Sequence, residues 1–164
     1  MSKRKGKLRQ VVDWSAAVWA GVVSGMVFLL ANVIINAAIT GSPWIIFRLF
    51  ATIIMGPEVL PPPAGFDLKI FAIAHLIHVP LSIGFACLIA YVLHRWGIIV
   101  GIIGGAIFGL ALYLINFYTL TYFFPWFFPL RSWMMMLSHV IYGATAGGVY
   151  EALEVEEFVP LEQE

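Results

Sequence analysis

The stretch GIIVGIIGGAIFGLALYLINFYTLTY, residues 97–122, decides the fold of this chain, because it is long and contains no charged residue. A helix needs about 20 consecutive apolar residues to cross the roughly 30 Å hydrocarbon core of a bilayer. Hydrocarbon offers no water to backbone N–H and C=O groups, so a spanning segment must satisfy them internally, as a helix does. We therefore predict a transmembrane helix at residues 97–122.

Three other apolar runs have comparable length, near residues 14–40, 68–93 and 132–152. The 164 residues are 62% hydrophobic and 11% charged, whereas a soluble domain carries about 25% charged residues. The sequence thus predicts an all-α integral membrane protein with one four-transmembrane-helix bundle at residues 14–152. The apolar stretch at residues 43–55 is too short to span and contains Arg48, so we expect a short interfacial or re-entrant helix after the first span.

Charged residues gather at the two ends of the sequence. The first ten residues include Lys3, Arg4, Lys5, Lys7 and Arg9, and the last fourteen include six glutamates. We predict a basic cytoplasmic N-terminus at residues 1–13 and an acidic, solvated cytoplasmic tail at residues 153–164. The first apolar run exceeds the ~7–15 residues of a signal-peptide core, so we expect a retained helix.

The basic residues also predict the orientation of the bundle. The N-terminal group and Arg95 fall on one side of the predicted membrane, and Arg48, Lys69 and Arg131 fall on the other. Lys and Arg are enriched on the cytoplasmic side. Both termini are therefore predicted to be cytoplasmic, and the tryptophans, which favour the interface, lie near predicted helix ends.

Glycines recur at a spacing of four residues in three of the predicted spans. They are Gly21 and Gly25, then Gly97, Gly101, Gly105 and Gly109, and finally Gly143 and Gly147. Small residues at this spacing allow the backbones of two membrane helices to approach closely. We interpret them as packing positions within the chain, with docking to another subunit as the alternative.

The two halves of the sequence resemble each other weakly. One constant offset relates Gly21, Gly25 and Asn36 to Gly101, Gly105 and Asn116. A second offset relates the segment that begins at His75 to the one that begins at His139. These matches indicate a possible tandem two-helix pseudo-repeat about an axis along the membrane normal.

Polar residues inside the predicted spans form the candidate site. They are Asn32, Asn36, His75, His78, Asn116 and His139. One residue from each span lies at a common depth of about 10 Å below the outer boundary, at 1.5 Å per residue. The four are Asn36, His75, Asn116 and His139. Buried polar groups in lipid need partners, so we expect this layer to form an interhelical hydrogen-bond network.

Two further hypotheses remain for the polar layer. It could line a path for an ion, a proton or a small solute, as in a small channel or carrier. Alternatively, His75, His78 and His139 are weak candidates for ligands of copper, zinc or haem iron. The sequence contains no recognisable catalytic pair or phosphate loop, so we expect a protein that is not an enzyme.

Several segments resemble a known group of proteins. They are residues 59–67 (VLPPPAGFD), residues 109–118, residues 124–127 (FPWF), the pair Ser138-His139 and the pair Tyr142-Gly143. They are similar to a family of small, uncharacterised bacterial inner-membrane proteins, some of which are named sodium:proline symporters. The resemblance covers most of residues 14–150 and implies four helices without an assigned activity. A true sodium/proline symporter has far more helices, so that activity is not implied.

These observations lead to a functional hypothesis. Short connections, packing glycines and aromatic segments leave little room for a catalytic domain. We therefore expect an accessory or scaffold subunit of a larger complex in the bacterial inner membrane. Its expected partners are the lipid bilayer and other membrane-protein subunits, and no nucleic acid.

Overall fold

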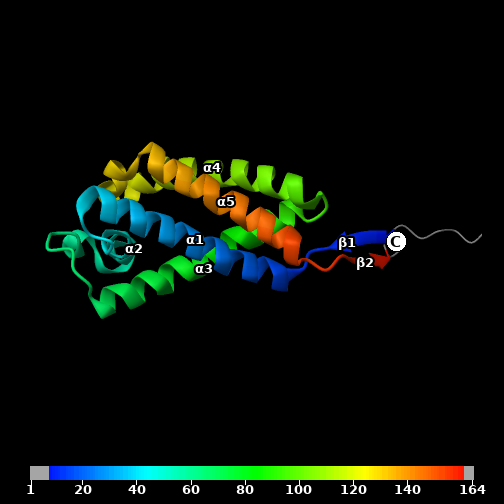
Figure 1. The fold of residues 1–164 in the computed structure, drawn as a ribbon, viewed down its shortest axis with the longest axis horizontal. Coiled ribbons are helices and arrows are strands. Elements are labelled where there is room, and N and C mark those ends of the chain that lie inside the picture. The colour runs from blue at the N-terminus through cyan, green and yellow to red at the C-terminus, as the bar shows by residue number, and fades with distance from the viewer. Residues whose placement is uncertain (1–7, 161–164) are drawn as a thin grey trace, which may run out of the picture.

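The structure is a computed structural model that describes residues 8–160, and it is a bundle of long helices (Figure 1). The helices are α1 (Trp14–Thr40), α2 (Ile45–Met55), α3 (Leu68–Leu93), α4 (Gly97–Phe123) and α5 (Trp133–Leu153). Two short 3-10 helices and two strands complete it: η1 (Pro57–Val59), η2 (Pro125–Leu130), β1 (Leu8–Val11) and β2 (Glu157–Pro160). Most of the predicted basic group and the last two glutamates lie outside the described residues.

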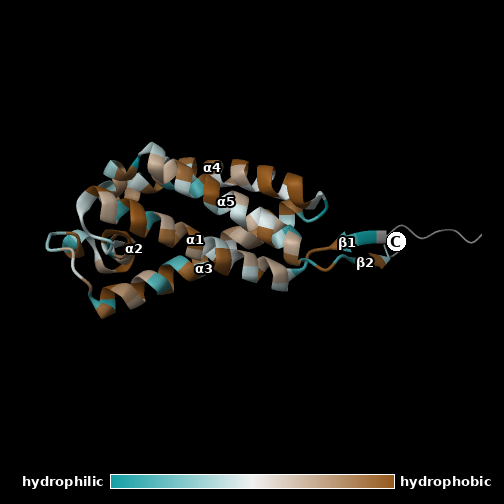
Figure 2. Cartoon of the chain, viewed as in Figure 1, coloured by the Kyte–Doolittle hydropathy of each residue, from teal (hydrophilic) through white to brown (hydrophobic). Residues whose placement is uncertain are grey.

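The prediction of a helical membrane protein is confirmed. Helices α1, α3 and α4 are each long and apolar enough to cross a membrane. The bounds of all four long helices agree with the predicted runs to within one residue. Hydrophobic residues predominate along the helices, and hydrophilic ones concentrate toward the two ends of the bundle (Figure 2).

The helices are arranged around a central pair, α1 and α5. Helix α5 packs against α1 and α4, and α1 packs against α3 and α5. Helices α3 and α4 meet at their connecting turn and diverge toward the opposite end, where α2 packs against α3 (Figure 1). We call these two ends the ribbon end, which carries β1 and β2, and the α2 end.

Helices α4 and α5 are in direct backbone contact along their glycines. A Cβ atom added to Gly105 would overlap the carbonyl oxygen of Gly143, and one added to Gly109 would overlap that of His139. Gly101 and Gly147 face each other in the same way nearer the ribbon end. These glycines therefore lie at the contact between α4 and α5 within the chain.

Helices α1 and α3 meet through a second pair of glycines. A Cβ atom on Gly21 would lie 2.5 Å from the Cα atom of Ile83, and one on Gly25 would lie 2.6 Å from Oγ of Ser82. Gly97 differs from the other predicted packing glycines. An added Cβ there would meet nothing within 4 Å, and its φ of +77° instead allows the tight turn between α3 and α4.

Two arginines hold the connections at the α2 end. Arg48 donates hydrogen bonds to the carbonyl oxygens of Val59 and Gly65 (2.6 and 3.1 Å), which ties α2 to the proline-rich segment. Arg131 donates to the carbonyl oxygen of Phe117 (2.8 Å), which ties η2 to α4. The carbonyl oxygens of Val59 and Gly65 lie outside the α-helices, so the bonds from Arg48 satisfy groups that no α-helix pairs.

The two ends of the chain pair with each other, which the prediction of two separate solvated tails did not include. Strands β1 and β2 form an antiparallel two-stranded ribbon that projects beyond the bundle (Figure 1). Asp13 joins the ribbon to α1, because Oδ1 caps the N–H of Ala16 (3.0 Å) and Oδ2 accepts from the N–H of Val155 (3.2 Å). The bond from Ala16 holds the pKa of Asp13 below its usual value.

Candidate functional site

A chain of hydrogen bonds crosses the middle of the bundle from α1 to α5. Ser82 donates from Oγ to the carbonyl oxygen of Gly21 (2.7 Å), and Nε2 of His78 bonds to that of Gly25 (3.1 Å). Tyr142 of α5 then donates from its hydroxyl to the carbonyl oxygen of Ser82 (2.6 Å). The close glycine contact between α1 and α3 exposes these carbonyl oxygens to side chains of the neighbouring helix.

Phe28 of α1 is the aromatic centre of the site. Its ring stacks on the imidazole of His78, with centroids 5.7 Å apart, and meets the imidazole of His139 edge to face at 5.0 Å. Tyr142 and Phe50 also approach it edge to face, each at 6.4 Å. Offset and edge-to-face pairs of this kind stabilise a core beyond their buried area.

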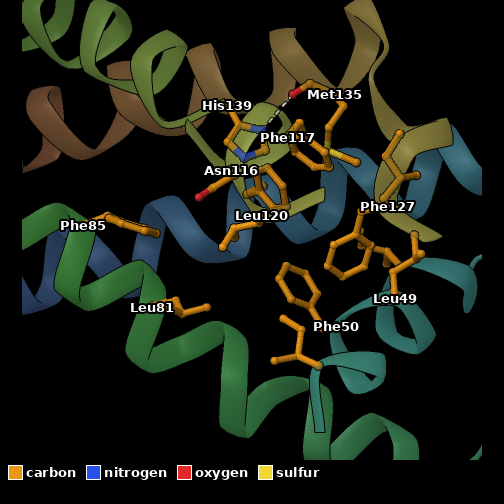
Figure 3. A pocket seen from close by; sticks show the side chains of 14 residues that line it. Leu49, Phe50, Leu81, Phe85, Asn116, Phe117, Leu120, Phe127, Met135 and His139 are labelled. Atoms are coloured by element: carbon orange, nitrogen blue, oxygen red, sulfur yellow. Dashed lines mark hydrogen bonds between the residues drawn. The ribbon is translucent and has the colours of Figure 1, made fainter. Parts of the chain in front are cut away.

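A cavity of about 160 Å³ opens beside this cluster (Figure 3). Its lining comes from α1, α2, α3, α4, η2 and α5 and is mostly apolar; the aromatic members are Phe28, Phe50, Phe85, Phe117 and Phe127. A smaller cavity of about 80 Å³ shares several of these residues and reaches Ser82 and Tyr142. The two cavities together form a pocket on the side of the bundle where α3 and α4 diverge.

Two polar side chains line both cavities, and both belong to the predicted layer. They are Asn116 of α4 and His139 of α5. Figure 3 shows them on one side of the cavity, across from Leu81 and Phe50. Nδ1 of His139 bonds to the carbonyl oxygen of Met135 (2.8 Å), which can only accept, so Nδ1 is the donor. In the neutral imidazole, Nε2 is then an acceptor that faces the cavity.

Other members of the predicted layer are satisfied within their own helices. Asn32 donates to the carbonyl oxygen of Phe28 (2.9 Å), and Asn36 donates to that of Asn32 (2.7 Å). His75 bonds to the carbonyl oxygen of Phe71 (2.8 Å), and its ring stacks on Phe47 of α2, with centroids 5.5 Å apart. The predicted layer therefore has three parts. Asn32, Asn36 and His75 bond within their own helices, His78 belongs to the network between helices, and Asn116 and His139 line the cavities.

The three histidines do not converge on a common point. His78 and His139 both contact Phe28, whereas His75 lies against α2. Within residues 8–160, no group of three or more His, Cys, Asp or Glu side chains is placed to hold a metal ion. The described geometry therefore gives no support to these residues as a shared set of metal ligands.

The sequence reasoning missed the part played by Tyr142, Phe28 and the ribbon. One signal was available for Tyr142, because it follows His139 by three residues and so lies on the same face of the helix. No comparable pattern marks Phe28, which is one of many apolar residues in α1.

Comparison with known proteins finds no matching family model, no similar curated protein and no similar solved structure. The family resemblance described above therefore stays a prediction.

Proposed function

We propose that this chain is a four-span protein of the bacterial inner membrane that acts as a non-enzymatic accessory or scaffold subunit of a larger membrane complex. The observation that carries the proposal is the β1–β2 ribbon, which lies outside the apolar bundle.

Helix α5 is proposed as the fourth span. Its 21 residues reach about 31 Å at 1.5 Å per residue, which suffices for the hydrocarbon core. Its polar residues Ser138, His139 and Tyr142 are buried inside the bundle, so they do not oppose insertion. An even number of crossings also agrees with the pairing of β1 with β2 at one end of the bundle.

The ribbon end is proposed to be cytoplasmic. Arg9 lies in the ribbon and Arg95 in the turn between α3 and α4, at the same end, and the sequence before β1 adds four basic residues. The α2 end carries three basic residues, Arg48, Lys69 and Arg131, and the guanidinium groups of Arg48 and Arg131 donate hydrogen bonds within the chain. The excess of basic residues at the ribbon end supports the positive-inside orientation.

The orientation has a direct test with single cysteines in a Cys87→Ala background. Cysteine at Ala64 should react with a membrane-impermeant maleimide on intact cells. Cysteine at Gln10 should react only after the membrane is permeabilised. Labelling of both positions on intact cells would contradict the four-span topology.

The ribbon is the proposed partner surface. Two paired strands alone are marginally stable in water, and each leaves one edge of N–H and C=O groups without a strand beside it. A strand from the cytoplasmic part of a second membrane subunit can add to such an edge through main-chain hydrogen bonds. We propose that a strand of a second membrane subunit pairs with an edge of the ribbon in this way.

The subunit role is tested by purifying the full chain in a mild detergent and measuring which proteins co-migrate in stoichiometric amounts. Val159→Pro places a residue without an N–H in β2 and should release the partner, while circular dichroism shows the helices intact. Gly65→Ala is the control, because it lies at the α2 end and an added Cβ meets nothing within 4 Å. A lone chain in several detergents, or a partner retained by Val159→Pro, would overturn the proposal.

The channel, carrier and metal hypotheses stay predictions with less support. A hydrated path requires polar groups along its length, and Asn32, Asn36 and His75 instead bond within their own helices. Flux measurements in liposomes, and an absorption spectrum with metal analysis, would test these alternatives.

A further inference from the structure

We propose that the cavity between α3 and α4 binds the hydroxyl-bearing aromatic ring of a lipid-soluble molecule, a phenol or quinol ring on an apolar tail. This inference goes beyond the subunit role and does not depend on the ribbon. An unpaired acceptor, the size and lining of the cavity, a neighbouring amide and the opening of the cavity support it.

The first observation is the unpaired Nε2 atom of His139. The side chain is only 8% exposed, and Nδ1 is held by Met135. Within residues 8–160, no side-chain or backbone donor reaches Nε2. Nε2 is not enclosed by protein, because it is accessible from the cavity. Once a ligand fills the cavity, an acceptor without a partner costs free energy, so Nε2 favours a ligand that brings a donor such as a hydroxyl group.

The second observation is the size and lining of the cavity. Its volume of about 160 Å³ is close to the ~150 Å³ of an apolar cavity that takes up benzene, so it fits one six-membered ring. Five phenyl side chains line it and provide edges and faces for an aromatic ligand. No charged residue is among its lining residues, so an uncharged ring fits better than an anion or a cation.

The third observation is the neighbour of His139 in the wall. Asn116 is half-buried, lines the same cavities and carries both a donor and an acceptor on its amide. It can therefore bond to the oxygen of the hydroxyl group that donates to His139. A few polar groups in a mostly apolar wall are typical of small-molecule sites, where they fix the orientation of the ligand.

The fourth observation is the opening of the cavity. Leu81 of α3 and Leu120 of α4 line it and are nevertheless 44% and 36% exposed, so it reaches the outer surface of the bundle where these helices diverge. His139 lies six residues after the start of α5, which is about 9 Å along the helix. An opening at this depth faces lipid, so the ligand enters from the bilayer and leaves its tail there.

The probe for this site is 4-hexylphenol, and hexylbenzene is the matched compound without the hydroxyl group. Binding is measured by equilibrium dialysis with the full chain in nanodiscs, and empty nanodiscs correct for partition into lipid. We expect saturable binding of one 4-hexylphenol per chain, about 5–10-fold tighter than that of hexylbenzene.

His139→Phe keeps the ring and removes the acceptor, so it should weaken 4-hexylphenol about 5–10-fold and leave hexylbenzene unchanged. His75→Phe is the matched control, since His75 has the same bond to the residue four positions earlier but does not line the cavities. It should bind both compounds like the wild type.

A readout on the wild type keeps the test independent of variant folding. The ¹⁵N shift of Nε2 in His139 should move when 4-hexylphenol is added and stay in place with hexylbenzene. Equal affinity for the two compounds, no saturable binding above empty nanodiscs, or an unchanged Nε2 shift would each overturn the proposal.

Discussion

The hydroxyl group of Tyr142 in α5 donates to the carbonyl oxygen of Ser82 in α3, 2.6 Å away, and so links helices that contact each other only slightly. Ser82 in turn donates to α1, so the three helices are joined in one network. Tyr142 and Ser82 are far apart in the sequence, so the bond between them can form only when the helices have packed together.

Tyr142→Phe should lower the free energy of unfolding by about 0.5–1.5 kcal/mol, because one buried interhelical hydrogen bond is lost without a cavity. Reversible unfolding in mixed micelles measures the change. Tyr118→Phe is the control, since that side chain is 59% exposed and its hydroxyl makes no hydrogen bond within residues 8–160. Equal effects of the two substitutions would argue against the network.

Gly109→Ala should destabilise the bundle by about 1–3 kcal/mol, because the new Cβ overlaps the carbonyl oxygen of His139 and forces α4 away from α5. Gly84→Ala on α3 is the matched control, since nothing lies within 4 Å of its Cβ position. Thermal unfolding compares the two. A Gly109→Ala variant as stable as Gly84→Ala would contradict the close contact of α4 with α5.

Trp126→Phe should loosen the α2 end. Nε1 of Trp126 in η2 donates to Oγ1 of Thr52 in α2 (2.9 Å), and this bond connects α2 to η2. Hydrogen exchange followed by mass spectrometry should show faster exchange in α2 and η2 and no change in the ribbon. Trp96→Phe, in the exposed turn at the ribbon end, should leave exchange at the α2 end unchanged.

The contact of Asp13 with the ribbon should depend on pH. Its pKa lies below 3.8 in the folded chain, chiefly because the carboxylate accepts the N–H of Ala16. The stabilisation is thus fully present above about pH 3.8 and is lost as the pH falls through the lower folded pKa. The amide signal of Val155 should titrate with a midpoint below 3.8. Asp13→Asn should abolish that titration, and a midpoint above 3.8 would contradict the assignment.

The sequence was sufficient to predict the helices and their bounds. Apolar runs of the required length end at residues that break or cap helices, such as Gly41, which ends α1 with a φ of +75°. Asp67 marks the start of α3, where its side chain accepts a hydrogen bond from the N–H of Ile70 (3.0 Å). Such signals are local, so they can be read without knowledge of the neighbouring helices.

The arrangement of the polar groups could be predicted only in part. Residue spacing gives the depth of His75 and His139 along their helices, but the direction of each side chain depends on helix packing. His75 therefore faces α2, whereas His139 lines the cavity. The ribbon was missed for a similar reason: four-residue strands at opposite ends of a chain give no periodic signal that distinguishes them from tails.

The position of α1 has a consequence for how this protein is made. Of the helices in residues 8–160, α1 leaves the ribosome first, yet it packs against α5, the last of them to leave. The N–H of Asp13 also bonds to the hydroxyl of Tyr150 (3.3 Å). During synthesis α1 can pair with α3, while its second face waits in lipid or beside the insertion machinery. The contact of α1 with α5 can form only after α3 and α4 have also been made, so the bundle closes late in synthesis, when its first and last helices come together.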